Sequence, residues 1–210
     1  MRNKRPIPLK AKPKFAIVVD GETEFWYFQM LKRNEKLIKV DIKPEIPQRK
    51  KLSDLYSKVI ELANSYDKVY WIIDLDVILS ESLQAKKGQQ KAIDIFLEYK
   101  RIIENKYKNV IVIINQPCIE FWFLIHFKYT AQQFSNCDGA GKQLKKHIPD
   151  YAKSEKFFTK QDNDIYLKLK FHIAKALSNS KKLPLFNKAN PSRGLSEMSK
   201  LFEDIGINKE

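Results

Sequence analysis

Short apolar runs alternate with longer amphipathic stretches along the first 130 residues. Apolar runs rich in β-branched and aromatic residues, typical of buried strands, lie at 15–20, 68–76 and 109–114. A polar–apolar alternation at Ile38, Val40 and Ile42 is typical of a half-exposed strand. The amphipathic stretches predict helices at 24–34, 53–65 and 89–107. Strands that alternate with helices in this way are typical of an α/β fold with a mostly parallel sheet flanked by helices.

The pattern changes after the last of these strands. The apolar stretch that follows Pro117 predicts a helix packed deeply on the sheet. Strand signals vanish from Thr130 onward, where we expect helices near 140–148, 163–179 and 194–204. The segment 77–90 is expected to be a mobile loop. We therefore predict a flexible basic arm at 1–14, an α/β core at 15–130 and a helical C-terminal extension at 131–210 that packs on the core.

Carboxylates stand where two of the predicted strands end. Asp20 closes the first strand, and Glu22 and Glu24 follow it on the turn into a helix. Asp74 and Asp76 close the strand that begins at residue 68 and would point to the same side of it. Ligands of open α/β sheets bind beyond the carboxyl ends of the strands. Because hard cations prefer oxygen ligands, we expect Mg²⁺ or Mn²⁺ there, and the plainer alternative is a solvated strand end.

Other candidates have a structural interpretation beside the functional one. Glu24 would also stabilise the first turn of its helix through the helix dipole. Glu120 lies in an apolar helix, so it is either a member of the site or the acid of an internal ion pair. His126 fits a core or edge histidine better than a catalyst. Cys118 and Cys137 have no metal-type spacing and predict no disulfide framework.

The net charge indicates which kind of binding partner to expect. The formal net charge is +14, and the segments 1–14 and 138–210 each contribute +6. A polyanion is the expected partner, with nucleic acid (DNA or RNA) ahead of a membrane surface. No apolar run is long enough to span a membrane and no signal-peptide core is present, so we expect a cytoplasmic protein. The Gly139–Lys142 stretch lacks the spacing of a phosphate-binding loop.

Three motifs together resemble the RloB-like family, which is associated with bacterial restriction-linked and abortive-infection loci. They are Asp20-Gly-Glu-Thr-Glu24, Asp74-Leu-Asp76, and Asn115-Gln-Pro-Cys-Ile-Glu-Phe-Trp-Phe-Leu-Ile-His-Phe127, with a weaker match at Asn190-Pro-Ser192. That family is similar to Toprim domains, whose Rossmann-like fold binds Mg²⁺. Asp20 falls where a Toprim domain has glutamate, and Asp74 and Asp76 fall on its Asp-x-Asp. The resemblance implies that Asp20, Asp74 and Asp76 bind the metal.

The resemblance, together with the charge pattern, predicts a Mg²⁺-dependent nuclease, or nuclease-like effector, that defends against phage. Glu22 or Glu24 would accept a proton, and Glu120 would belong to the same site. The alternative is a non-catalytic nucleic-acid-binding or sensor subunit that serves a partner ATPase from the same locus. Strand transfer ranks behind both because no nucleophilic tyrosine accompanies the acids.

Overall fold

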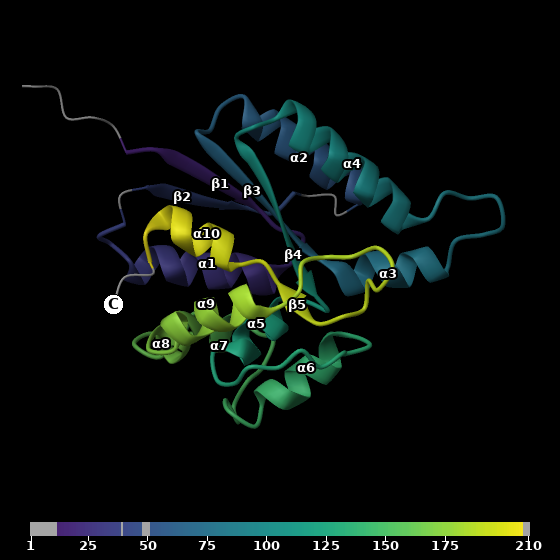
Figure 1. The fold of residues 1–210 in the computed structure, drawn as a ribbon. Coiled ribbons are helices and arrows are strands. Elements are labelled where there is room, and N and C mark those ends of the chain that lie inside the picture. The colour runs from purple at the N-terminus through teal and green to yellow at the C-terminus, as the bar shows by residue number, and fades with distance from the viewer. Residues whose placement is uncertain (1–11, 39, 48–50, 208–210) are drawn as a thin grey trace, which may run out of the picture.

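A five-stranded sheet forms the centre of the molecule, in the order β2-β1-β3-β4-β5 (Figure 1). The computed structural model describes residues 12–38, 40–47 and 51–207, so most of the predicted basic arm lies outside the described residues. The strands are β1 (Lys14–Val18), β2 (Asp41–Glu45), β3 (Lys68–Asp74), β4 (Val110–Gln116) and β5 (Leu195–Ser196). The first four are parallel and β5 pairs antiparallel with β4. The predicted α/β fold with a mostly parallel sheet is confirmed.

Helices cover both faces of the sheet because its strands are apolar on both sides (Figure 1). In β1, Ala16 and Val18 pack on one face, with α2 (Leu52–Ala63) and α4 (Ala92–Lys106). Ile17 and Val19 pack on the other, with α1 (Glu22–Asn34) and α5 (Ile119–Ile125). The alternation of side chains along each strand therefore divides the core into two layers.

The C-terminal residues join the second layer rather than form a layer of their own. Their helices are α6 (Cys137–Leu144), α7 (Glu155–Phe158), α8 (Ile165–Lys170), α9 (Ile173–Lys182) and α10 (Ser199–Ile205). Buried side chains of all five helices belong to the same apolar cluster as α1 and α5. The prediction that strands vanish after Thr130 is wrong, because β5 completes the edge of the sheet beside β4.

An ion pair between the partly exposed Arg33 and the buried Asp164 fastens this C-terminal part to α1. The Asp164 side chain is fully buried, and its carboxylate accepts hydrogen bonds from Arg33 (2.7 Å) and from the Asn34 amide (2.9 Å). The same carboxylate caps α8 by accepting from the backbone N–H of Leu167 at 2.9 Å. Three donors compensate the loss of water around this charge, so Asp164 fixes where α8 meets α1.

The segment after β3 differs from the prediction. Helix α3 (Leu75–Leu83) begins directly after Asp74, so the first half of the expected loop at 77–90 is helical. Asp76 lies in the first turn of α3 and not on the strand. Asp74 and Asp76 therefore do not leave one strand on the same side.

The order of the strands locates the crevice in which such a fold binds ligands. The chain leaves β1 to form β2 on one side of it, and then returns to place β3 on the other side. The direction of winding thus reverses between β1 and β3, and the carboxyl ends of those two strands border the crevice.

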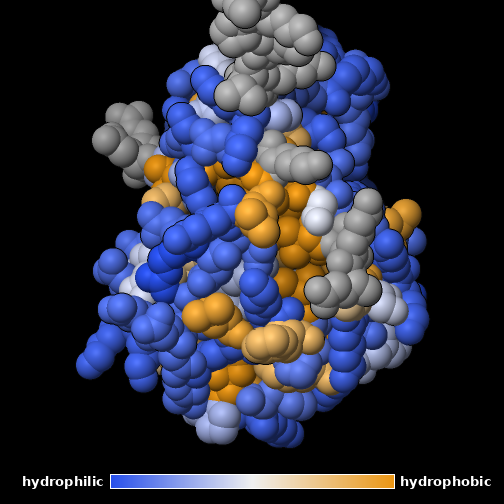
Figure 2. All heavy atoms as spheres, turned by 90° about the vertical axis from the view of Figure 1, so that its left-hand side faces the viewer, coloured by the Kyte–Doolittle hydropathy of each residue, from blue (hydrophilic) through white to orange (hydrophobic). Residues whose placement is uncertain are grey.

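A hollow of about 830 Å³ lies elsewhere, near the start of β2. Its lining includes Leu37, Ile38, Phe171 and Ile205, and apolar side chains gather on that face of the molecule (Figure 2). None of the predicted site acids lines it. Among the described residues, no helix combines the length and apolar character needed to cross a membrane.

Candidate metal centre

Three carboxylates lie near the crevice between β1 and β3: Asp20, Glu24 and Asp74, which we call the acidic centre. The side chains of Glu24 and Asp74 are in contact, and Asp20 acts on both through its charge. The three do not place their oxygens within 4.8 Å of one another as Asp74, Cys118 and Cys137 place their ligand atoms. Asp20 follows the end of β1, Glu24 lies in the first turn of α1, and Asp74 is the last residue of β3. Glu24 is only 4% exposed, and its pKa rises to about 7 through burial and then through the charge of Asp20. Acids from the ends of two neighbouring strands therefore lie near one another, and Glu24 is buried among them.

The Glu24 carboxylate lies directly against Gly21. A Cβ atom at position 21 would overlap with Oε2 of Glu24 and would lie 3.3 Å from its Cδ. The backbone of Gly21 is extended (φ −122°, ψ 155°), a conformation open to any residue. A side chain at position 21 would therefore force the Glu24 carboxylate to shift, whereas the backbone conformation itself would accept any residue.

The Asp74 carboxylate lies in surroundings that a bound cation would stabilise. Its Oδ2 accepts a weak hydrogen bond from the backbone N–H of Ile119 at 3.3 Å. Its Oδ1 is buried and has no hydrogen-bond partner among the described residues. Burial, followed by the charges of Glu24 and Asp20, raises the pKa of Asp74 well above its ordinary value. The Glu24 carboxyl also lies within hydrogen-bonding reach of Asp74, so without a cation the two acids share a proton. A buried oxygen that accepts from no described donor, beside two further carboxylates, fits a divalent cation with oxygen ligands in place of that proton.

Two of the predicted acids stand apart from this arrangement. Oδ2 of Asp76 accepts a hydrogen bond from the backbone N–H of Cys137 at 3.0 Å, so Asp76 ties α3 to the start of α6. Burial raises the pKa of Asp76, and the backbone hydrogen bonds oppose that rise. Glu22 is exposed on α1. Cation binding by Asp76 and proton transfer by Glu22 remain predictions.

Glu120 forms an internal ion pair beside the acidic centre. It is only 1% exposed, and its Oε1 accepts hydrogen bonds from the Tyr151 hydroxyl and from Lys153 Nζ, both at 2.7 Å. Burial alone would lower the pKa of Lys153, but the carboxylates of Glu120, Glu24 and Asp74 raise it. The Lys153 side chain is 48% exposed, so one cation both neutralises Glu120 and faces solvent. Sequence reasoning missed Tyr151 and Lys153, which have no motif around them.

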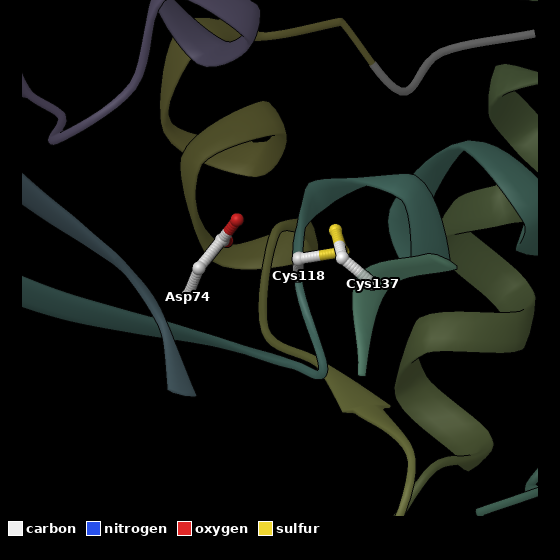
Figure 3. Close-up of side chains that lie close together, drawn as sticks. All are labelled: Asp74, Cys118 and Cys137. Atoms are coloured by element: carbon white, nitrogen blue, oxygen red, sulfur yellow. A yellow bond between two sulfur atoms is a disulfide. The ribbon is translucent and has the colours of Figure 1, made fainter. Parts of the chain in front are cut away.

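Two sulfur atoms complete this corner of the molecule. Cys118 and Cys137 form a disulfide, which corrects the prediction that they imply none. The Oε2 atom of Glu120 lies 2.9 Å from the Cys118 sulfur and 2.8 Å from the Cys137 sulfur. Asp74, Cys118 and Cys137 each place a potential ligand atom within 4.8 Å of the others, and Figure 3 shows the three side chains together.

His126, at the end of α5, belongs to the core. Its Nδ1 lies 2.9 Å from the carbonyl oxygen of Trp122, and its ring packs edge-on against the Trp122 ring. Burial lowers the pKa of His126 to about 3, so the ring is neutral at physiological pH. These contacts support a structural role for His126 in the core.

Comparison with known proteins gives one match. The family model described as RloB-like protein matches residues 15–205 of the chain. The match covers the sheet, the acidic centre and the C-terminal helices. No curated protein and no solved structure matches the chain.

Proposed function

This chain belongs to the RloB-like protein family, and we propose that it is a metal-dependent nuclease-like effector that hydrolyses nucleic-acid phosphodiester bonds in defence against phage. The observation that carries the proposal is the acidic centre. Asp20, Glu24 and Asp74 come from two neighbouring strand ends, and a buried oxygen of Asp74 lacks a hydrogen-bond partner among the described residues. Such a centre sits where doubly wound sheets bind their ligands.

The carboxylates would hold Mg²⁺ or Mn²⁺, with Asp76 as a further predicted ligand. A cation bound there supplies Lewis-acid polarisation of the scissile phosphate and a lower pKa for the attacking water. Glu24, buried against Gly21, keeps its carboxylate aimed at Asp74. The exposed Glu22 is open to water and would accept the proton that water releases.

Positive charge supports a nucleic-acid substrate. The net charge of +14 favours association with a phosphate backbone, DNA or RNA. At the centre itself, the half-exposed ammonium of Lys153 stands beside Glu120 and the acidic centre. A lysine in that position would attract a phosphate toward carboxylates that would otherwise repel it.

The test is cleavage of plasmid, single-stranded DNA and RNA by the purified chain with Mg²⁺ or Mn²⁺. We expect Asp74→Asn and Glu24→Gln each to lower the rate by about 100-fold or more, the usual cost of removing one electrostatic stabiliser from an active site. Glu81→Gln, an exposed acid of α3, is the matched control and should cleave as the parent does. Cleavage that survives both substitutions would rule out the acidic centre as the catalytic site.

The Lys153–Glu120 pair favours one alternative. Because an internal ammonium already offsets part of the acidic charge, the centre could serve structure alone, in a nucleic-acid-binding or sensor subunit that acts with a partner ATPase. In that case the chain would bind nucleic acid, and cations would raise its melting temperature, without turnover in the presence or absence of the ATPase.

A further inference from the structure

The corner occupied by Cys118 and Cys137 brings together four potential ligand side chains from three segments of the chain. Asp74 ends β3, Cys118 precedes α5, Glu120 lies in its first turn, and Cys137 begins α6. Ligand atoms of Asp74 and the two cysteines lie within 4.8 Å of one another, and Glu120 Oε2 lies within 2.9 Å of both sulfurs. Cys118 and Glu120 are each 1% exposed, whereas Asp74 and Cys137 are partly exposed, so a cation could reach this corner from solvent.

The position of Glu120 suits reduced sulfur better than oxidised sulfur. Disulfide sulfurs carry no hydrogen, so they offer a carboxylate oxygen no hydrogen bond. Thiols at the same places would donate to Glu120 Oε2, and thiolates there would require a cation between themselves and the carboxylates. Lys153 Nζ lies 3.3 Å from the Cys137 sulfur, within reach of a hydrogen bond to it.

We propose that, once their disulfide is reduced, Cys118 and Cys137 form with Asp74 and Glu120 a binding site for a thiophilic divalent cation of the Zn²⁺ class. Zn²⁺ takes cysteine, aspartate and glutamate ligands in tetrahedral sites. Zn–S bonds of about 2.3 Å and Zn–O bonds of about 2.0 Å put the ligand atoms roughly 3.3–3.8 Å apart. The four side chains reach that spacing through rotamer changes once the two sulfurs separate.

This site differs in chemistry from the acidic centre, although the two share Asp74. Mg²⁺ prefers oxygen ligands, whereas thiolates select softer cations. The inference does not depend on nuclease activity, because it concerns binding at the sulfurs and is measured without a substrate. The disulfide state excludes the cation, since neither bonded sulfur can act as a thiolate ligand.

The redox chemistry requires an external reductant. A phosphine and one water convert the disulfide into two thiols, and the phosphine becomes its oxide. Binding of the divalent cation then replaces the two thiol protons, which pass to the solvent.

The test uses Co²⁺ as a spectroscopic probe on the full chain. The protein is reduced with a phosphine, desalted without oxygen and assayed for two free thiols before the titration. We expect the near-ultraviolet thiolate-to-cobalt absorption to saturate at one equivalent, and Zn²⁺ to abolish it by displacement. Chain with its disulfide intact, which needs no substitution, should show none of this absorption, and neither should Cys118→Ser plus Cys137→Ser.

Carboxylate variants test the rest of the ligand set. Asp74→Asn should retain the absorption but weaken Co²⁺ binding by at least about 10-fold, in line with the loss of a group that supports a metal site. Asp138→Asn, an exposed acid next to Cys137, is the matched control and should bind as the parent does. Fully reduced parent chain without thiolate-to-cobalt absorption would overturn the proposal, and equal affinity in the Asp74 variant would remove Asp74 from the site.

Discussion

The effect of Gly21→Ala on the free energy of unfolding should depend on whether the Glu24 carboxylate is present. In Gly21→Ala the new methyl group overlaps with Glu24 Oε2, and the three nearest atoms that it meets all belong to Glu24. Because the backbone at position 21 is extended, alanine adds no strain of its own. Overpacking of this kind costs about 1–3 kcal/mol, and the loss of glycine's freedom in the unfolded chain returns about 0.4–1 kcal/mol.

We therefore expect Gly21→Ala to lower the free energy of unfolding by up to about 2.6 kcal/mol in the parent chain. In a Glu24→Ala background the obstacle is gone, and the same substitution should stabilise by about 0.4–1 kcal/mol. The assay is urea denaturation of the four proteins in metal-free buffer, which gives a coupling energy between the two sites. An equal effect of Gly21→Ala in both backgrounds would refute the placement of the Glu24 carboxylate over Gly21.

Two further predictions concern stability. The pKa of Glu24 is about 7 in the folded protein against 4.5 in the unfolded chain, so the metal-free protein should lose stability as pH rises from 4.5 through 7. Glu24→Gln should flatten that dependence in urea denaturation at several pH values, and a slope as steep as the parent's would contradict the assignment. Asp164→Ala should lower the free energy of unfolding by about 2–4 kcal/mol, because Arg33, Asn34 and the start of α8 lose their shared acceptor. An unchanged denaturation midpoint would show that this pair does not fasten the C-terminal helices.

The parallel sheet was predictable because β1, β3 and β4 are continuous apolar runs with amphipathic helices between the strands. The failures occur where local sequence does not decide the structure. The sequence pattern assigns residues 75 and 76 to the strand and 77–90 to a loop, yet the chain turns into α3 directly after Asp74, without a glycine or proline. β5 has only two residues, and its pairing depends on the edge that β4 offers.

The candidate site was predictable only as a set of acids near strand ends. Sequence reasoning offered Glu22 and Glu24 as alternative proton acceptors and expected the helix to begin at residue 24, whereas α1 begins at Glu22 and buries Glu24. Lys153 reaches Glu120 and Cys137 reaches Cys118 only through the path of the chain after α5. Contacts between such distant segments are set by tertiary packing, which no local motif records.

The position of a bound cation tests the account most directly. Crystals of the full chain grown with Mn²⁺ allow the ion to be located by its anomalous scattering, without reference to activity. The account predicts a peak about 2.0–2.6 Å from a carboxylate oxygen of Asp74 and from one of Asp20 or Glu24. Saturating Mn²⁺ with no peak at these carboxylates, or with peaks only at other acids, would contradict it.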